Sequence, residues 1–206
     1  MDEATEITLL LRRAGHDLHE PLVAIEGYLA LLNEHGGLDA DARELVDGAR
    51  AGAAQMRRLL RDTLAYARAM TAEPRFERVD AAACAAEAAK RVGVDPKMGA
   101  LPVVRADAEM LTGVLEAALS NARRFAKAEV SVEAIDGDIV VRDDGPGMDD
   151  AKLARLFKPF ERMDAKAGSG LGLATARVLV ERMGGKIRAE SRPGEGCAVF
   201  VRLPRE

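Results

Sequence analysis

Apolar residues recur every three or four positions along the first part of the chain. In segment 4–34 the steps alternate between four and three, with one extra step of four, and the apolar positions are Ile7, Leu11, Ala14, Leu18, Leu22, Ile25, Leu29 and Leu32. Segment 39–70 repeats the pattern with smaller residues, from Ala42 to Met70. This spacing is typical of a coiled-coil seam. It predicts two long helices joined by the short loop at 34–37.

Such a helical hairpin buries too little apolar surface to be stable by itself. Two copies can bring their seams together in a four-helix bundle. We therefore expect residues 1–72 to form a dimerising hairpin. The apolar pattern alone thus predicts a homodimer.

Strand-like and helix-like segments alternate over residues 76–206. The predicted helices cover 80–92, 107–126, 149–157 and 170–183, and the predicted strands cover 103–104, 129–135, 139–142, 186–191 and 198–203. Asp136-Gly137 between two strands is a strong hairpin turn signal. Residues 71–78 read as a linker. The expected fold class is α+β, with a helical hairpin followed by an α/β sandwich of mixed sheet on helices.

Composition narrows the range of partners and locations. Hydrophobic residues make up 48% of the 206 positions, which is enough for packed cores. The net charge of −4 gives no reason to expect nucleic acid as a partner. Cys84 and Cys197 lie far apart, so a reduced, cytoplasmic protein is expected. The sequence has neither a signal-peptide pattern nor an apolar run of about 20 residues, so no membrane segment is expected in this chain.

His16 is the first candidate for chemistry. It lies two residues from both Ala14 and Leu18, so it should point away from their seam toward solvent. Asp17 follows it, and a carboxylate that accepts a hydrogen bond from one ring nitrogen makes the other a better nucleophile. Taken alone, a histidine in this place is more often an ordinary surface histidine. A metal site with His19 is disfavoured, because two histidines make a poor site.

Three further motifs follow His16 in a fixed order. They are Asn121-Ala122-Arg123-Arg124-Phe125, then Asp143-Asp144-Gly145-Pro146-Gly147, then Gly168-Ser169-Gly170-Leu171-Gly172 before a predicted helix. Glycines before a helix expose backbone N–H groups that can bind phosphate. Singly, each motif has a plainer interpretation, such as an Asp-Gly turn or a flexible loop.

Taken together, the four motifs resemble those of two-component sensor histidine kinases over residues 5 to 204. The resemblance implies that His16 is the phosphorylated histidine, with Pro21 five residues later as in the family motif. It also implies a catalytic core that binds ATP and Mg²⁺. His16 would act as nucleophile and Asp17 as its orienting base.

The resemblance also implies which residues bind the nucleotide. Asn121 would be the Mg²⁺ ligand, Arg124 would meet a phosphate in place of the family's usual Lys, and Phe125 would line the pocket. Asp143 would accept a hydrogen bond from the adenine amine. The remaining nucleotide contacts would come from Gly145, Gly147, Arg162, Gly168, Gly170, Leu171 and Gly172, and the segment 156–160 matches the family's phenylalanine motif.

The implied activity is autophosphorylation of His16, followed by transfer to an aspartate of a response regulator receiver domain. An upstream sensor domain or a partner protein would supply the signal. One alternative is a non-enzymatic phosphotransfer protein with a vestigial ATP domain. Another is an ATPase of the gyrase-like class, but such enzymes carry a water-activating glutamate four residues before the metal-binding Asn. Here that position is Ala117, and Glu116 should lie on a different face of the helix.

Overall fold

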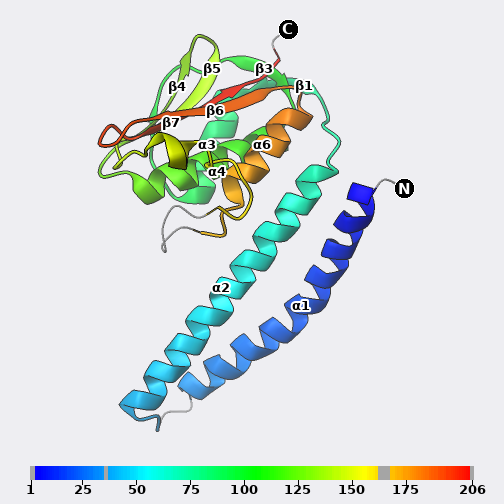
Figure 1. The fold of residues 1–206 in the computed structure, drawn as a ribbon, viewed down its shortest axis with the longest axis vertical. Coiled ribbons are helices and arrows are strands. Elements are labelled where there is room, and N and C mark those ends of the chain that lie inside the picture. The colour runs from blue at the N-terminus through cyan, green and yellow to red at the C-terminus, as the bar shows by residue number, and fades with distance from the viewer. Residues whose placement is uncertain (1–2, 35–36, 162–167, 205–206) are drawn as a thin grey trace. The chain divides into compact units, whose positions relative to one another are not determined.

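The computed structural model describes residues 3–34, 37–161 and 168–204. The chain divides into two compact units, Met1–Thr71 and Ala72–Glu206. The first unit is a hairpin of two antiparallel helices, α1 (Glu3–Glu34) and α2 (Ala40–Met70) (Figure 1). The Asp39 carboxylate caps α2 by accepting a hydrogen bond from the Ala42 N–H at 2.8 Å. Helix α1 continues through Pro21.

Small residues set the contact between the two helices of the hairpin. Gly15 is buried, and a Cβ at this position would lie 2.5 Å from a methyl carbon of Leu64. Ala53 and Ala67 of α2 are buried, and Leu22 of α1 is only 3% exposed. Because Gly15, Ala53 and Ala67 lack bulk, the backbones of α1 and α2 can approach closely.

The apolar seam predicted for α1 divides between two faces. Leu22 is buried, whereas the apolar residues at seven-residue spacing remain exposed: Leu11 by 37%, Leu18 by 58%, Ile25 by 49% and Leu32 by 49%. Residues seven apart lie on one side of a helix. The hairpin therefore carries an apolar stripe, formed by these four residues, that its own α2 does not cover.

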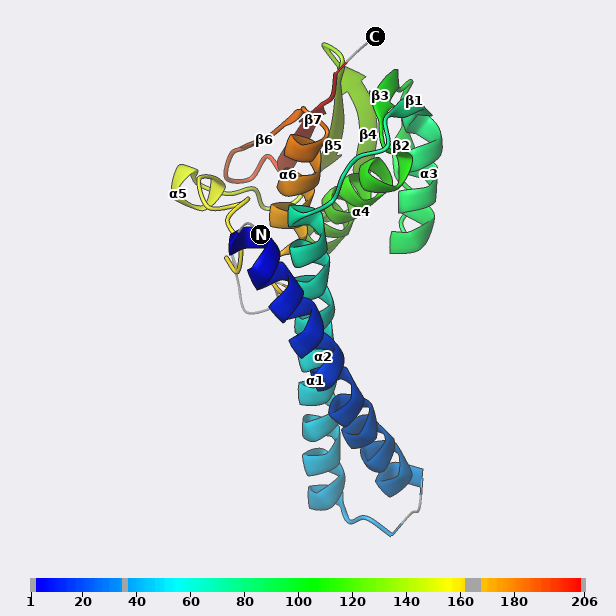
Figure 2. The ribbon, with the colours of Figure 1, turned by 90° about the vertical axis from the view of Figure 1, so that its right-hand side faces the viewer.

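The second unit is an α/β sandwich. A five-stranded sheet has the order β2-β4-β5-β7-β6, and β1 pairs with β3 in a separate two-stranded sheet. The β2–β4 pair is parallel and the other pairs are antiparallel, so the five-stranded sheet is mixed. Helices α3, α4 and α6 pack on one face of this sheet (Figures 1 and 2). The elements are β1 (Glu77–Asp80), α3 (Ala81–Val92), β2 (Lys97–Met98), β3 (Val103–Ala106), α4 (Ala108–Phe125), β4 (Val130–Ile135), β5 (Asp138–Asp143), α5 (Asp150–Leu153), α6 (Gly172–Arg182), β6 (Lys186–Ser191) and β7 (Cys197–Arg202).

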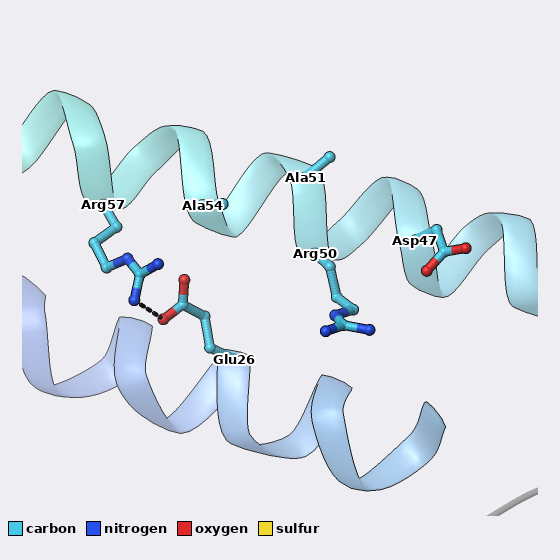
Figure 3. Close-up of a pocket in the computed structure, with 6 residues that line it drawn as sticks. All are labelled: Glu26, Asp47, Arg50, Ala51, Ala54 and Arg57. Atoms are coloured by element: carbon cyan, nitrogen blue, oxygen red, sulfur yellow. Dashed lines mark ion pairs between the residues drawn. The ribbon is translucent and has the colours of Figure 1, made fainter. Parts of the chain in front are cut away.

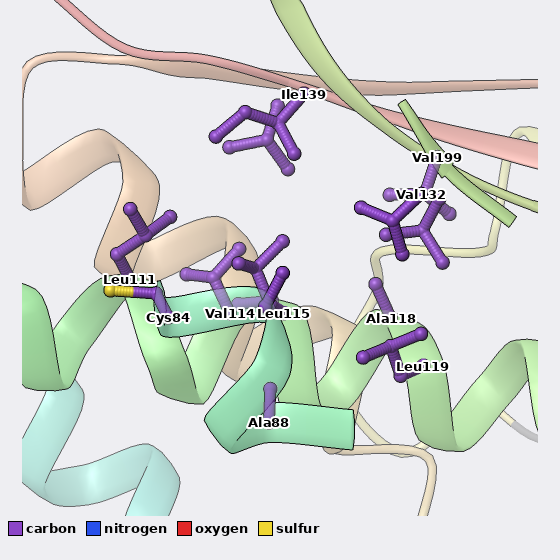
Figure 4. Close-up of a cluster of buried hydrophobic side chains, with 14 of the residues drawn as sticks. Cys84, Ala88, Leu111, Val114, Leu115, Ala118, Leu119, Val132, Ile139 and Val199 are labelled. Carbon is purple, nitrogen blue, oxygen red and sulfur yellow. The ribbon is translucent and has the colours of Figure 1, made fainter. Parts of the chain in front are cut away.

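The core lies between the sheet and the helices. Helix α4 begins after Asp107, whose carboxylate accepts a hydrogen bond from the Met110 N–H at 3.0 Å. The buried positions of α4 recur at helical spacing and include Leu111, Leu115 and Leu119, which belong to one hydrophobic cluster with Val132 and Val199 of the sheet (Figure 4). This packing fixes the helix whose last two turns carry the asparagine motif.

On the opposite face of the sheet, side chains of its own strands cover a small apolar cluster. Val140 and Phe200 are buried there, and the Arg188 guanidinium stacks on the Phe200 ring at 3.7 Å from its centroid. The buried Asp138 carboxylate forms ion pairs with Arg202 and Arg188. Long arginine side chains thus shield apolar surface while their charged ends are paired.

The structure confirms the predicted fold class, a helical hairpin followed by an α/β unit, and corrects several boundaries. The predicted linker 71–78 is shorter, because Glu77 already belongs to β1. Strand β2 was not predicted, because two residues carry no periodic signal. The helix predicted at 149–157 is the single turn α5. Within the described residues, no helix combines the length and the apolar character that crossing a membrane requires.

Candidate active site

His16 lies in α1, but its side chain falls outside the described residues. Asp17 is exposed. Gly15 precedes His16 and packs against Leu64, so the turn of α1 that carries the candidate acceptor is one of close approach between the two helices. The nucleophile and orienting roles expected for His16 and Asp17 stay predictions.

The hairpin also contains a pocket between α1 and α2 (Figure 3). The Arg57 guanidinium forms an ion pair with Glu26 there at 3.1 Å. Its lining residues are Glu26, Asp47, Arg50, Ala51, Ala54 and Arg57. The basic residues Arg57, Arg58 and Arg61 are all exposed.

Asn121 lies near the C-terminal end of α4 and is half-buried. Ala117, one turn earlier on the same face, approaches the start of α6: its Cβ would lie 4.0 Å from a Cβ at Gly172. Asn121 therefore lies on the face of α4 that is directed toward Gly172, at the end of the glycine motif. The structure brings these two predicted motifs together.

The Arg124 side chain reaches the same glycine motif. A Cβ at Gly168 would lie 3.1 Å from two guanidinium nitrogens of Arg124, so this cation packs directly on the Gly168 backbone. Arg123 has a different role, because its guanidinium donates a hydrogen bond to the Val92 carbonyl at the end of α3. Of the two arginines, Arg124 is the one placed to meet an anion at the glycine motif.

The end of α4 is also joined to the Asp143–Gly147 loop. A Cβ at Gly145 would lie 2.5 Å from the Phe125 carbonyl oxygen, so only glycine permits this close approach. The Asp144 carboxylate accepts hydrogen bonds from the backbone N–H groups of Lys127, at 2.8 Å, and Ala128, at 3.1 Å. Phe125 itself is half-buried, at the junction of the two motifs.

Asp143 ends β5 and is 5% exposed. One of its carboxylate oxygens accepts a hydrogen bond from the Gly145 N–H at 2.9 Å. Burial raises the pKa of Asp143, and backbone N–H groups of Gly145 and Cys197 partly oppose that rise. A buried carboxylate held in this way is a preorganised acceptor for a hydrogen-bond donor such as an exocyclic amine.

Helix α6 begins at Gly172, the last residue of the glycine motif. Leu171 is fully buried and anchors the N-cap position, and no side chain caps the helix there. The Ser169 hydroxyl oxygen accepts a hydrogen bond from the Leu171 N–H at 3.2 Å. The first turn of an 11-residue helix without a side-chain cap offers backbone N–H groups to a phosphate.

The phenylalanine motif packs beside the glycine motif. Leu156 and Phe157 pack against the core, whereas Phe160 is exposed. The Phe160 N–H donates a hydrogen bond to the Gly170 carbonyl at 3.1 Å, which ties the two motifs together. The predicted γ-phosphate contact, Arg162, lies outside the described residues.

Glu116 faces away from these motifs. Its carboxylate lies 3.8 Å from the Arg91 guanidinium on α3. As predicted, it occupies a different face of α4 from Ala117 and Asn121. The described part of α4 therefore places no glutamate beside the asparagine to activate a water molecule.

Two neighbouring carboxylates at the end of β5 have opposite pKa shifts. Burial raises the pKa of Asp143, whereas the pKa of Asp144 is lowered, first by the Ala128 N–H and then by the other backbone N–H groups it accepts from. A group whose pKa is higher in the folded than in the unfolded state stabilises the protein at pH values below its unfolded-state pKa. This stability is lost as pH rises through its folded-state pKa. A group whose pKa is lower in the folded than in the unfolded state stabilises the protein at pH values above its unfolded-state pKa. This stability is lost as pH falls through its folded-state pKa.

We therefore expect opposite pH profiles from Asp143→Asn and Asp144→Asn. As pH rises from about 3 to 7, the free energy of unfolding of the parent should fall relative to Asp143→Asn and rise relative to Asp144→Asn. Urea unfolding of the three proteins across this range measures both differences, and each variant serves as the control for the other. Parallel pH profiles for the two variants would contradict the opposite pKa shifts of Asp143 and Asp144.

The site also includes residues that the sequence analysis did not single out. Cys197 and Ser191 lie in one row of the sheet with Asp143, because Asp143 pairs with Cys197 and Cys197 pairs with Ser191. Burial, followed by the charge of Asp143, raises the pKa of the Cys197 thiol to about 12. The sequence predicted the strands 186–191 and 198–203, but it carried no signal for their pairing with the end of β5, so this row was not predicted.

The fold defines a class of protein in which a two-helix hairpin precedes an α/β unit that brings an asparagine motif and two glycine motifs together. Two family models match accordingly: the His Kinase A (phospho-acceptor) domain over residues 6–71, and the histidine kinase-, DNA gyrase B- and HSP90-like ATPase over residues 106–206. Together they match most of the chain. The chain belongs to the sensor histidine kinases.

Individual relatives agree with this assignment. The phytochrome-like protein Cph1 of Synechocystis sp. is 31% identical over 93% of this chain, and the alignment covers 28% of that protein. The alginate biosynthesis sensor protein KinB of Pseudomonas aeruginosa is 28% identical over 93% of this chain and 36% of its own length. The chain thus spans about a third or less of these curated relatives.

A solved structure is also similar. Full-length ShkA in complex with AMPPNP has a TM-score of 0.73 and 29% identity, covering 95% of this chain and 45% of that one. AMPPNP is an ATP analogue. The match therefore links the fold of this chain to a histidine kinase that was crystallised with a nucleotide.

Proposed function

We propose that this chain is the catalytic core of a histidine kinase that phosphorylates His16 from Mg-ATP. The observation that carries the proposal is the convergence of three motifs in the second unit. Arg124 packs on Gly168, Phe125 meets Gly145, and Asn121 lies on the face of α4 that approaches α6. A cation and uncapped N–H groups can bind phosphates, and a buried carboxylate can bind a base, so together they can bind a nucleoside triphosphate.

The donor set at Asn121 fits magnesium. The described residues contain no group of three His, Cys, Asp or Glu side chains that could enclose a metal ion. Mg²⁺ keeps several waters and is held by few protein oxygens together with substrate phosphates. We infer that the Asn121 side-chain oxygen would supply the protein ligand. The bound ion would offset charge on the phosphates.

The proposed reaction transfers one phosphoryl group. A ring nitrogen of His16 attacks the γ-phosphorus in line, the bond from that phosphorus to the bridging oxygen breaks, and ADP leaves. Asp17 orients the ring by accepting a hydrogen bond from its other nitrogen. Arg124, and Arg162 as the resemblance implies, stabilise the charge on the phosphates. The phosphoryl group then passes to an aspartate of a response regulator receiver domain.

Incubation with Mg-ATP labelled at the γ-phosphate tests this proposal. Label that is stable to base and labile to acid would identify phosphohistidine. Absence of both label and nucleotide binding would instead favour the non-enzymatic phosphotransfer protein. Steady release of phosphate that survives loss of His16 would favour the gyrase-like ATPase.

We further propose that the functional form is a homodimer. The support is the apolar stripe of α1, at Leu11, Leu18, Ile25 and Leu32, which is exposed in the single hairpin. Its seven-residue spacing matches the repeat with which helices pack in a bundle. The phospho-acceptor family model over residues 6–71 covers the same segment.

Ile25→Glu should therefore convert the dimer into monomers. The change would place a carboxylate from each copy in an apolar interface, and burying unpaired charges costs several kcal/mol. Because Ile25 is 49% exposed in the single hairpin, the contacts that the change removes are those between two copies and not those within one hairpin. Light scattering should show the apparent mass falling by about half.

Gly27→Glu provides the matched control. A Cβ at Gly27 would meet no described atom within 4 Å, and this position lies on another side of α1 from Ile25. The control should keep the mass of the parent. Equal masses for Ile25→Glu and the parent would show that the stripe does not form the interface.

The source of the signal is also part of the proposal. The relatives are much longer than this chain, and we propose that a sensor region or a partner protein supplies the signal. The expected cytoplasmic, reducing location is supported by Cys84 and Cys197, which are both free and buried.

A further inference from the structure

The turn between β6 and β7 contacts the loop that follows Asp143. The Gly194 N–H donates a hydrogen bond to the Pro146 carbonyl at 2.7 Å. A Cβ at Gly147 would overlap the Arg192 carbonyl oxygen, and a Cβ at Gly196 would overlap the Asp143 carbonyl oxygen. The two backbones therefore touch with no room for side chains. Gly147 and Gly196 also have positive φ angles of 65° and 78°, which other residues rarely adopt.

One side chain joins these two segments. The Ser191 hydroxyl accepts a hydrogen bond from the Met148 N–H at 3.0 Å and donates one to the Gly196 carbonyl at 2.6 Å. Met148 is the residue directly after the Asp143–Gly147 motif, and Gly196 directly precedes Cys197. A single hydroxyl thus satisfies one backbone group on each side of the contact.

The same contact reaches the carboxylate that is proposed to recognise adenine. Ser191, Cys197 and Asp143 form one row across β6, β7 and β5. The Cys197 backbone N–H donates a hydrogen bond to the Asp143 carboxylate, and the Gly145 N–H donates another. The hydroxyl of Ser191 holds both the strand start that carries Cys197 and the end of the loop that carries Gly145.

We propose that Ser191 is a positioning residue for nucleotide binding, which holds the Asp143–Met148 loop in the conformation that recognises the base. The proposal rests on the proposed function and adds a residue that would not touch ATP. Without the hydroxyl, the Met148 N–H and the Gly196 carbonyl lose their partner. The loop then has to be ordered when the nucleotide binds, which weakens affinity without changing the chemistry at the γ-phosphate.

Ser191→Ala should raise the dissociation constant for Mg-ATP by about five- to ten-fold, measured by calorimetry on the full chain. The KM for ATP in autophosphorylation should rise by a similar factor, while kcat at saturating ATP stays unchanged. Ser191→Thr retains a hydroxyl and should restore the affinity of the parent. This pattern separates positioning from general damage, which would lower kcat as well.

Thr112→Ala is the matched control. Its buried hydroxyl donates to the Ala108 carbonyl at 2.8 Å in the first turns of α4, so its loss should lower stability without reaching the Asp143 loop. Equal ATP affinity for Ser191→Ala and the parent would overturn the positioning role, as would an equal loss of affinity in Thr112→Ala. A parent that binds no Mg-ATP would overturn the proposed function itself, which is a different result from either.

Discussion

His16→Ala should abolish incorporation of label from γ-labelled Mg-ATP, down to the background of the assay. The imidazole nitrogen is the proposed attacking atom, and alanine offers no nucleophile in its place. Nucleotide affinity should remain that of the parent, because the proposed ATP contacts all lie in the second unit. Autoradiography after acid and base treatment, together with calorimetry, measures both quantities.

His19→Ala provides the matched control for this result. His19 is an exposed histidine one turn further along α1, so its removal perturbs the helix in a similar way. It should keep most of the incorporation. Label that persists in His16→Ala, or that disappears in both variants, would contradict the assignment of His16 as the acceptor.

Asp143→Asn should weaken Mg-ATP binding by about 100-fold, because a hydrogen bond to a charged acceptor is lost and an amide can present a donor to the adenine amine. Asparagine has nearly the same shape, and its oxygen can still accept the Gly145 N–H. The unit should therefore stay folded. Calorimetric titration gives the change in dissociation constant, and thermal unfolding checks the fold.

Asp138→Asn tests whether this effect is specific. Asp138 is also buried and also lies on β5, but its carboxylate serves Arg202 and Arg188 on the opposite face of the sheet. Breaking a buried ion pair lowers stability, so Asp138→Asn should unfold at lower temperature and yet keep its affinity for ATP. Equal affinity for Asp143→Asn and the parent would remove Asp143 from the site.

Local signals in the sequence predicted several elements correctly. Helix α4 begins within one residue of the predicted start at 107, because the Asp107 carboxylate caps it. Asp136-Gly137 was expected to form a hairpin turn, and both residues have the positive φ angles, 50° and 82°, that such a turn requires. In each case a side chain or a backbone preference acts within a few residues, so the sequence alone carries the information.

Other features depend on contacts between distant residues. The periodicity of α1 predicted one seam, but it could not show that Leu22 faces α2 while Ile25 stays exposed, because both positions share the same repeat. The bond between Ser191 and the Met148 N–H joins residues 43 positions apart through a backbone group, which leaves no pattern in the sequence. Arg123 and Arg124 look alike in the sequence, and only the fold assigns one to Val92 and the other to Gly168.

Strand β6 is the outermost strand at one end of the five-stranded sheet, so its free backbone groups could pair with a strand of another molecule. Its outward residues are Lys186, Arg188 and Glu190, and Arg188 is held by Glu190, Asp138 and the Phe200 ring at once. The charges of Arg188 and Glu190 at this edge are therefore held in position. They oppose the edge-to-edge aggregation to which open sheets are prone, and they do so with the same arginine that shields the apolar outer face.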